Sequence, residues 1–529
     1  MKYGFSVQWF VGDVQNHVLK APSQVAALET GARVKGISAE FWRAKWQGES
    51  RIRSVSFSGL ESLGDNALRD CFKNCPNIET AVFESLSVLD GAGALYCAFQ
   101  NNAALREVLF PALSSIEHPT GGENARGLCY ECHALEGIGF PVLETVSAYR
   151  GMYDAFRNCA KLTAVSFPML RSATGTDAFR EAFYGCAGIV TVNFPTLKTV
   201  GAGVFLNAFY NNAKLEAAGF NALETAGDHA FNSAFQNCTK LKEIHFPALT
   251  SIGGSTFYSA FQNSGLEQDI EIDFSTIPGS AFELAFAGTK VTSANFPRVN
   301  AVNSNSFKQA FQNCTQLRSV AFPALVECGG DNSGFEQAFA GCTALTDVDF
   351  SALQSVSGWL SRTCLARAWS GCTALKRIAF PKLALVHGAD KFSSAFENCT
   401  ALETADFSKL ATITTAYNYK NFDNAFKGCT KLASVDFSAL ATVGGADLLS
   451  HAFEGCELLA RLDFPSLASV ASTSFTTMLA GSSVEEVHFP AAMQSAIEAL
   501  DGYDTCFGAG AGAVDFYFDL GLEENNDAE

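Results

Sequence analysis

Phenylalanine returns at a nearly fixed interval along this 529-residue chain, within phrases such as Ala234-Phe235-Gln236-Asn237-Cys238. With the bulky apolar residue of each phrase taken as an anchor, the mean interval between anchors is about 27 residues. A repeat of this length over almost the whole chain is typical of a solenoid, in which each copy is one turn packed on its neighbours. The 18 anchors are Trp46, Phe72, Phe99, Cys129, Phe156, Phe183, Phe209, Phe235, Phe261, Phe286, Phe311, Phe339, Trp369, Phe396, Phe426, Phe453, Leu479 and Phe507.

The residues just before each anchor predict a short helix. A second bulky apolar residue usually lies four positions earlier, as Phe231 does before Phe235, and alanine often precedes the anchor. Apolar residues at i and i+4 share one face of a helix, so about two helical turns are expected here. Two positions after the anchor the chain carries asparagine or glycine, such as Asn237 or Gly428, which tolerate a left-handed backbone and are expected to end the helix.

The residues after the anchor predict a short strand. Apolar residues at anchor +9 and +11, such as Ile244 and Phe246, alternate with polar ones, which indicates a strand with one buried face. Proline often follows the second of them, as Pro247 does, and ends strand pairing because it cannot donate a hydrogen bond. The predicted fold is an α/β solenoid of about 18 rungs, each about 27 residues long.

The phrase resembles the BspA-type, or Treponema pallidum-type, leucine-rich repeat, which combines an Ala-Phe, a cysteine, a Leu-x-x-Ile core and a proline-terminated strand. The resemblance covers roughly residues 42 to 518. The copies here are longer than usual, and Phe-Pro-x-Leu replaces the more common Ile-Pro. The resemblance implies a parallel β-sheet on the concave face, short helices on the convex face, and a bacterial surface protein acting in adhesion.

The chain divides into three predicted parts. Residues 1–41 lack the anchor phrase and are expected to form an N-terminal cap over the first rung, with Trp9, Phe10 and the neighbouring Trp42 supplying apolar cover. Residues 42–520 form the solenoid, whose last rung, 503–520, is degenerate. The acidic segment 521–529 is expected to be a disordered tail.

Seventeen cysteines raise the possibility of disulfides or a metal site, and the repeat argues against both. Eleven of them, including Cys186, Cys238 and Cys372, occupy the same position, anchor +3, which elsewhere holds Asn, Ser or Thr. A position that accepts these four residue types is expected to hold a small buried side chain that bonds to a turn. The pair Cys129-x-x-Cys132 fits the same two repeat positions and is not interpreted as a zinc or redox motif.

A binding site, if the sequence shows one, is expected at the outward strand positions anchor +8 and +10. In the C-terminal half these positions are rich in aspartate. Three of these aspartates, on consecutive rungs, would lie about 5 Å apart in an aspartate column, namely Asp406, Asp436 and Asp463. One interpretation is a solvated face that keeps the solenoid soluble, and the other is a site for a cationic protein, a host matrix protein or a divalent cation. The candidate binding residues are Glu243, Asp273, Asp347, Asp349, Arg377, Asp406, Asp436, Arg461 and Asp463.

Composition narrows the function classes. A formal net charge of −18 disfavours nucleic acid, because a phosphate backbone requires clustered Lys and Arg. Outward strand positions almost lack aromatic residues apart from Tyr517, which disfavours saccharide binding. The sequence contains no His-Glu-x-x-His, no Gly-x-Ser-x-Gly and no phosphate-binding Gly-x-x-x-x-Gly-Lys, so neither catalysis nor a cofactor is predicted.

We therefore expect a non-catalytic binding solenoid, adhesin-like, that recognises a protein partner through its concave sheet. The alternative is a structural or receptor-binding component of a phage or other large particle. The resemblance implies a cell-surface or secreted protein, whereas the start of the chain shows no signal peptide and the free thiols suit a cytoplasmic or virion-associated protein. No membrane-inserted segment is predicted, and the oligomeric state is left open.

Overall fold

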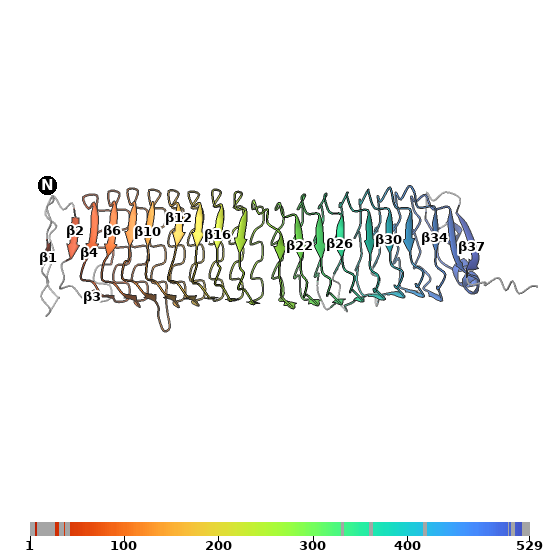
Figure 1. The fold of residues 1–529 in the computed structure, drawn as a ribbon, viewed down its shortest axis with the longest axis horizontal. Coiled ribbons are helices and arrows are strands. Elements are labelled where there is room, and N and C mark those ends of the chain that lie inside the picture. Colours follow the sequence, from red (N-terminus) through yellow and green to blue (C-terminus); the bar gives the residue numbers. More distant parts are fainter. Residues whose placement is uncertain are drawn as a thin grey trace, which may run out of the picture. The chain divides into compact units, whose positions relative to one another are not determined.

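In the computed structural model the chain is a coil of short parallel strands, about 17 turns of about 27 residues. The structure describes residues 6–7, 27–30, 36–37, 43–329, 333–358, 363–415, 420–505, 507–508 and 514–520. It divides into two units, residues 1–266 (unit 1) and 267–529 (unit 2). Most turns contribute one strand to a first row and a second strand to a second row (Figure 1).

In unit 1 the first row consists of two hydrogen-bonded sheets, and every strand pair is parallel. The first sheet contains β1 (Ser6–Val7), β2 (Ala27–Thr30), β4 (Ser54–Phe57), β6 (Thr80–Phe83), β8 (Glu107–Leu109) and β10 (Gly137–Gly139). The second contains β12 (Ala164–Ser166), β14 (Thr191–Asn193), β16 (Ala217–Gly219) and β18 (Glu243–His245). The second row contains β3 (Gly36–Ile37), β5 (Ser62–Leu63), β7 (Val88–Leu89), β9 (Ser115–Ile116), β11 (Thr145–Val146), β13 (Ser172–Ala173), β15 (Thr199–Val200), β17 (Thr225–Ala226) and β19 (Ser251–Ile252).

Unit 2 repeats this plan. Its first row contains β20 (Ile270–Glu271), β22 (Ser293–Asn295), β24 (Ser319–Ala321), β26 (Asp347–Asp349), β28 (Arg377–Ala379), β30 (Thr404–Asp406), β32 (Ser434–Asp436), β34 (Arg461–Asp463), β36 (Glu486–Pro490) and β37 (Asp515–Leu520). Its second row contains β21 (Thr276–Ile277), β23 (Ala301–Val302), β25 (Glu327–Cys328), β27 (Ser355–Val356), β29 (Leu385–His387), β31 (Thr412–Thr414), β33 (Thr442–Gly444) and β35 (Ser469–Val470).

Columns of phenylalanine fill the interior between the rows. The anchor Phe209 is fully buried, and its ring lies 5.4 Å from Phe183 and 5.3 Å from Phe235, nearly parallel to both. The anchor +11 residues form a second column, in which Phe194 and Phe220 are stacked at 5.3 Å. Because neighbouring turns bring equivalent residues into contact, one repeated side chain produces a continuous stack. The predicted register of the repeats is confirmed.

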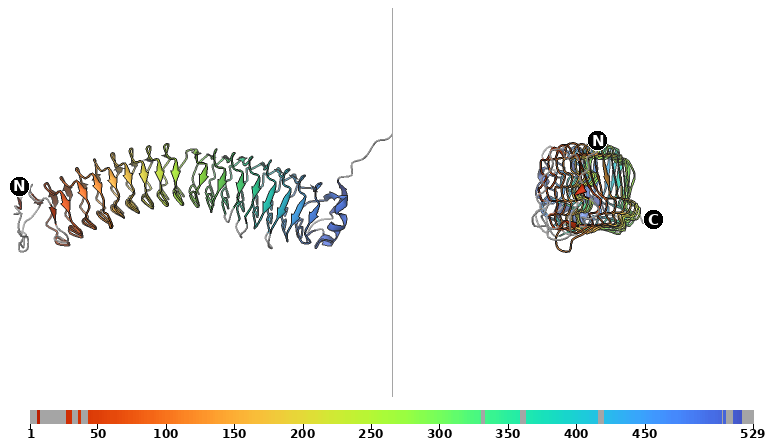
Figure 2. Two further views of the ribbon diagram at one scale, coloured as in Figure 1. Left: turned by 90° about the horizontal axis from the view of Figure 1, so that it is seen from below. Right: turned by 90° about the vertical axis from the view of Figure 1, so that its left-hand side faces the viewer.

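The predicted short helices before each anchor are wrong. In residues 228–237 the backbone instead forms consecutive tight turns with a left-handed residue at every fourth position, with φ of 55° at His229, 52° at Ser233 and 62° at Asn237. Every second backbone N–H donates to a carbonyl of the next turn of the solenoid, as Phe231 N does to Thr256 O at 2.9 Å. The alternate N–H groups donate within their own turn and so complete a tight turn, as Asn232 N does to His229 O at 3.1 Å. Figure 2 shows these turns repeated through each unit. We call the surface that they form the turn face.

The apolar residues at i and i+4 predicted a helix, but a run of turns that repeats every four residues also places i and i+4 on one face. The predicted left-handed positions are confirmed at Asn237 and Gly428, although the left-handed residue continues the run of turns instead of ending a helix. Among the described residues, the helices are confined to the C-terminal end. They are η1 (Ala491–Met493), α1 (Gln494–Glu498) and η2 (Tyr503–Thr505).

The predicted terminal parts lie largely outside the described residues. Of the predicted cap 1–41, the described segments are β1 to β3, and β2 pairs in parallel with β4, so the strand ladder begins before the first anchor. Trp9, Phe10 and Trp42 lie outside the described residues, and so does the predicted tail 521–529. In the predicted degenerate rung 503–520, β37 pairs in parallel with β36.

Candidate protein-binding surfaces

The predicted aspartate column exists as an in-register feature of the first row. Asp406 of β30 and Asp436 of β32 are direct partners across parallel strands, and each follows a buried residue of its strand, so both face outward as expected. Asp463 lies on β34, which belongs to a different hydrogen-bonded sheet from β32. The column is therefore continuous for one pair and interrupted before the third aspartate.

Three aspartates of this column have a local structural role. Oδ1 of Asp349, of Asp406 and of Asp436 each accepts a hydrogen bond from the backbone N–H two residues later, at 2.8 to 2.9 Å. That later residue is a serine in all three rungs, whereas most other rungs have proline there and so have no N–H to donate. An aspartate that closes a turn in this way is favoured for local reasons, without any ligand.

The remaining predicted site residues are exposed or half-buried, and most of them pair with one another or with neighbours. Arg461 Nε donates to Asp463 Oδ1 at 2.8 Å, Asp273 pairs with Arg298 at 3.2 Å, and Glu243 lies 3.5 Å from His245. Asp347 accepts from the Thr346 hydroxyl at 2.7 Å, and Arg377 is exposed on β28. Exposed pairs of this kind contribute about 0–1 kcal/mol each. Within the described part of the chain, no group of three His, Cys, Asp or Glu side chains is arranged to hold a metal ion.

Unit 1 carries an apolar recess on the outward side of its first row. It has a volume of about 430 Å³ and lies at β10, the last strand of one sheet, next to β12, the first strand of the other. Gly139 contributes no side chain here, and a Cβ atom at this position would lie 2.6 Å from Cδ2 of Leu109. A side chain at this position would therefore displace the end of the Leu109 side chain. The recess is defined by its lining residues, which are Leu109, Pro111, Ile138, Gly139, Phe140, Pro141, Ser166 and Pro168.

The surroundings of the recess are apolar on one side and acidic on the other. Val142 and Met169, each the residue after a lining proline, are 40% and 37% exposed. Glu107 lies over Gly137 of the next turn, where a Cβ atom would be 3.9 Å from its Oε1 atom. A partner group at this place would meet apolar surface and one exposed carboxylate.

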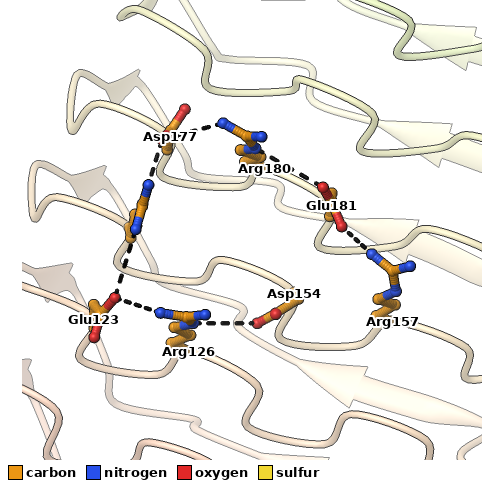
Figure 3. Close-up of polar contacts among 8 residues, drawn as sticks. Glu123, Arg126, Asp154, Arg157, Asp177, Arg180 and Glu181 are labelled. Atoms are coloured by element: carbon orange, nitrogen blue, oxygen red, sulfur yellow. Dashed lines mark hydrogen bonds and ion pairs between the residues drawn. The ribbon is translucent and has the colours of Figure 1, made fainter.

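A second candidate surface lies on the turn face of unit 1. Four arginines and four carboxylates from successive turns alternate there, linked by ion pairs (Figure 3). Arg126 donates to Glu123 at 2.6 Å and lies 3.9 Å from Asp154, and Arg157 donates to Glu181. We call this group, with Tyr96, Tyr153 and Tyr184, the arginine–tyrosine network; its charged members are Glu123, Arg126, Arg150, Asp154, Arg157, Asp177, Arg180 and Glu181.

Tyrosine rings separate the arginines along the stack. The guanidinium of Arg69 lies 4.0 Å from the centre of the Tyr96 ring, and that of Arg126 lies 4.8 Å from the Tyr153 ring. Arg157 lies 4.1 Å from the ring of Tyr184. Such contacts contribute roughly 0.5–1 kcal/mol at exposed sites. They hold long side chains, otherwise free to rotate, in one arrangement.

Asp154 is the most perturbed carboxylate of this network. Its pKa is raised to about 7, mainly by burial and in addition by the nearby charge of Glu181, while Arg126, Arg157 and a hydrogen bond from the Gly127 backbone oppose the rise. Its Oδ1 atom is buried and, among the side chains that the structure describes, has no hydrogen-bond donor. The side chain as a whole is only 18% exposed. Because this burial disfavours the ionised form, the carboxyl gains or loses its proton close to neutral pH.

The sequence interpretation missed the arginine–tyrosine network because it examined outward strand positions alone. The signal was present at anchor −3, where Arg69, Tyr96, Arg126, Tyr153 and Arg180 follow one another. That alternation can be found by aligning the repeats. Its significance depends on knowing that anchor −3 faces outward, and a helical interpretation of the segment does not show this.

The cysteine column agrees with the prediction at the repeated position. All eleven anchor +3 cysteines are free and buried, and their thiols donate to a backbone carbonyl of the preceding turn, as Cys186 Sγ does to Phe156 O at 2.9 Å. Burial raises the pKa of Cys238 and of Cys399 to about 12. These thiols are therefore packed hydrogen-bond donors, and Cys129 and Cys132 are among the buried free cysteines.

The expectation that the chain has no disulfide is wrong at one place. Cys328 at the end of β25 and Cys364 in the following turn form a disulfide, with their Cα atoms 6.5 Å apart. Neither occupies anchor +3, so the argument from the repeat did not apply to them. The two cysteines are 36 residues apart, so they hold non-equivalent positions of adjacent turns, Cys328 at anchor +17 and Cys364 at anchor −5.

These features define a leucine-rich repeat solenoid: parallel strands, one or two per turn, around a stacked apolar core. The family model described as the BspA type leucine rich repeat region matches in six copies, at residues 125–233, 152–285, 207–332, 283–421, 336–479 and 418–498. The chain belongs to this family. Repeat proteins of this kind are generally protein-binding scaffolds and typically non-catalytic.

Solved structures similar to this chain include a leucine-rich repeat protein from Bacteroides ovatus, with 19% identity, 76% of this chain and 82% of that chain covered, and a TM-score of 0.46. A leucine rich cell surface protein from Faecalibacterium prausnitzii shows 18% identity over 78% of this chain and 88% of its own, with a TM-score of 0.28. The leucine-rich repeat protein of T. pallidum shows 22% identity over 41% of this chain and 80% of its own, with a TM-score of 0.23. No curated protein sequence matches the chain.

None of the helices in the described residues is long and apolar enough to cross a membrane.

Proposed function

We propose that this protein is a non-catalytic binding solenoid that recognises a protein partner through the outward face of its first strand row, anchored at the recess of unit 1. The single observation that supports this most is the recess itself, because its volume of about 430 Å³ is within the range of about 300–1,000 Å³ usual for binding pockets. Exposed Val142 and Met169 extend the apolar area beside it. Such an area on a polar surface is characteristic of an interaction site.

The proposed occupant is an extended protein segment with one large apolar side chain next to a lysine or arginine. The apolar side chain fits the lining of Leu109, Ile138 and the three prolines, and the basic residue fits the carboxylate of Glu107 over Gly137. A buried apolar anchor with a polar contact at its rim is the arrangement that dominates many protein interfaces.

The test uses a displayed library of random seven-residue peptides, selected against the full chain. We expect enriched sequences to combine an aromatic or aliphatic residue with a neighbouring Lys or Arg. Ser166→Trp fills the recess and is expected to weaken binding of the enriched peptides at least about tenfold. Asn193→Trp is the matched control, since Asn193 is the exposed partner of Ser166 on the next strand and lies outside the recess.

Failure to enrich any sequence, or equal binding by Ser166→Trp and the wild type, contradicts the proposed site. Glu107→Gln is expected to weaken binding by a smaller factor and to reduce its salt dependence, because it removes the charge and leaves the apolar lining unchanged.

We further propose that the protein acts as an adhesin-like module at a bacterial cell surface, a role supported by its family. In this role the aspartate column of unit 2 is a secondary contact for a basic protein or a host matrix protein. Size-exclusion chromatography with light scattering distinguishes this from the alternative of a phage or particle component. A stable monomer is expected, whereas an obligate trimer or end-to-end assembly favours the alternative.

A further inference from the structure

We propose that the arginine–tyrosine network of unit 1 is a second interaction surface, which docks an acidic segment of a protein partner. This goes beyond the binding proposed for the recess, because the network lies on the turn face and shares no residue with the recess. Its members come from successive turns, so a bound segment would run along the stack.

The composition of the network is that of an interface centre. Arginine and tyrosine are enriched where protein interfaces carry most of their binding energy. In unit 1 the two alternate at anchor −3 from Arg69 to Arg180, one residue in each consecutive turn. The side chains are held by ring contacts of 4.0 to 5.7 Å before any partner arrives, so little further ordering is needed on binding.

The arginines have unused donors for an acidic partner. Each guanidinium has five N–H groups. Among the described residues, Arg126, Arg150 and Arg157 each make one hydrogen bond to a carboxylate of the network, and Arg180 lies 3.6 Å from Asp177. The four arginine side chains are 26% to 32% exposed, so added carboxylates can reach N–H groups that these contacts leave unused. Arginine binds a carboxylate through two parallel hydrogen bonds when geometry permits.

The ring geometry favours a protein segment over a polysaccharide. Sugar rings stack on exposed aromatic faces, but the faces of these tyrosines are covered. Tyr96 lies between Arg69 and Arg126, and Tyr184 lies between Arg157 and Tyr210, whose ring is stacked on it at 5.0 Å. The surface therefore offers ring edges and guanidinium groups, which suit carboxylate side chains.

The charge balance makes docking dependent on pH. Four arginines face four carboxylates, so the network is neutral when Asp154 is ionised and carries one positive charge when it is protonated. Burial sets that change near pH 7. The titratable and charged groups that face Asp154 are Arg126, Tyr130 and Cys97 from earlier turns, Tyr153 and Arg157 from its own turn, and Glu181 from the next turn. An acidic segment should therefore bind more tightly below neutral pH.

The experiment measures binding of a fluorescein-labelled hexaglutamate peptide to the full chain by fluorescence anisotropy at constant ionic strength. We expect affinity at about pH 6 to exceed that at about pH 8 by at least about fivefold. Asp154→Asn is expected to bind at about pH 8 as tightly as the wild type does at about pH 6. The double variant Arg157→Gln, Arg180→Gln is expected to lose at least about tenfold in affinity.

Arg106→Gln is the matched control, because Arg106 is an exposed arginine of the same unit outside the network. Should the double glutamine variant fail to fold by circular dichroism, the double lysine variant keeps both charges and is expected to show a smaller loss. Equal weakening by Arg106→Gln, absence of any pH dependence, or binding of heparin without binding of the peptide would overturn the proposal. Ser166→Trp, which fills the recess, is expected to leave peptide binding unchanged, so the two proposals fail separately.

Discussion

Units 1 and 2 carry equivalent columns on the turn face, and the residues in those columns differ. At anchor −3, unit 1 has the alternation of arginine and tyrosine that begins at Arg69, whereas unit 2 has Glu283, Lys308 and Glu336 followed by Ala, Ser, Thr and Asp residues. Lys308 and Glu336 form an ion pair at 3.3 Å, so adjacent turns of unit 2 are also linked there, without aromatic rings between them. Inside, both units contain the same anchor phenylalanine stack, for example Phe183–Phe209 at 5.4 Å and Phe286–Phe311 at 5.0 Å.

This contrast shows that the core columns and the surface columns are under different physical constraints. A core position must fill the space between two neighbouring turns, so its residue type is nearly fixed. A surface position needs only to tolerate the backbone, so it is free to carry a charge pattern specific to one unit. Features found in one unit alone are therefore the better indicators of function.

The strongest perturbation tests whether the two cores are equivalent. Phe209→Ala in unit 1 and Phe311→Ala in unit 2 each remove a fully buried ring from the middle of a stack. Each is expected to lower the free energy of unfolding by about 3–5 kcal/mol, because a cavity remains between two neighbouring rings. Urea denaturation followed by circular dichroism measures the loss. A loss below about 1 kcal/mol in one unit would show that its stack is not continuous in solution.

A smaller change in the free energy of unfolding is expected when Asp154 is replaced by Asn. No aspartate occupies the equivalent position, anchor −2, in unit 2. The folded-state pKa of Asp154, about 7, lies above its ordinary value of 3.8, so the folded state holds a proton that the unfolded state releases between these two pH values. Stability therefore falls as pH rises from about 4 to about 7 and then levels off. Asp154→Asn removes this dependence and is expected to be more stable than the wild type at about pH 8, by an amount on the order of a few kcal/mol.

The measurement is a series of thermal or urea unfolding curves across that pH range. The two proteins should have equal stability near pH 4, where the carboxyl is protonated in both states. Constant stability of the wild type from pH 4 to pH 8 would contradict the burial of this carboxylate.

The weakest response is expected from the aspartate column of unit 2. Replacing Asp406, Asp436 and Asp463 together by Asn leaves an oxygen that can accept the turn hydrogen bond at positions 406 and 436, and at position 463 it removes only an exposed ion pair with Arg461, so stability should change by less than about 1 kcal/mol. Asp436→Ala removes the acceptor for Ser438 N–H and should cost about 0.5–1.5 kcal/mol. If the triple variant also binds a cationic protein partner as tightly as the wild type at low salt, the column is a solvated face whose aspartates have only local roles, in the turns at Asp406 and Asp436 and in the pair with Arg461 at Asp463.

Several features of the fold were predictable from the sequence because they follow from repetition. The anchor spacing predicted the stack, and alternation at residues such as Ile244 and Phe246 predicted the strand that is observed as β18 with its buried Ile244. The buried cysteine at anchor +3 followed from the four residue types that share the position. The turn face was not predictable in the same way, because a helix and a run of four-residue turns both bring Phe231 and Phe235 to one side.

The candidate sites were less accessible than the fold. The aspartate column was predicted from outward positions, but its hydrogen bonds to Ser351, Ser408 and Ser438 require the backbone conformation. The recess lies where the first row changes from one sheet to the next, between β10 and β12, and that change of sheet is seen only in the folded chain. The disulfide of Cys328 and Cys364 joins two non-equivalent repeat positions, whose Cα atoms lie 6.5 Å apart in the folded chain.

Repetition in the amino-acid order was enough to establish that this chain stacks its turns around columns of phenylalanine, because identical apolar side chains at a constant interval have one common way to leave water. It was also enough to indicate the family, the left-handed positions and the buried thiols. The folded chain was needed to show what joins the turns outside the strands and which charges meet on the turn face. Contacts such as Arg126 with Asp154 cross from one turn to the next, and their geometry depends on a backbone that local pattern alone leaves undetermined.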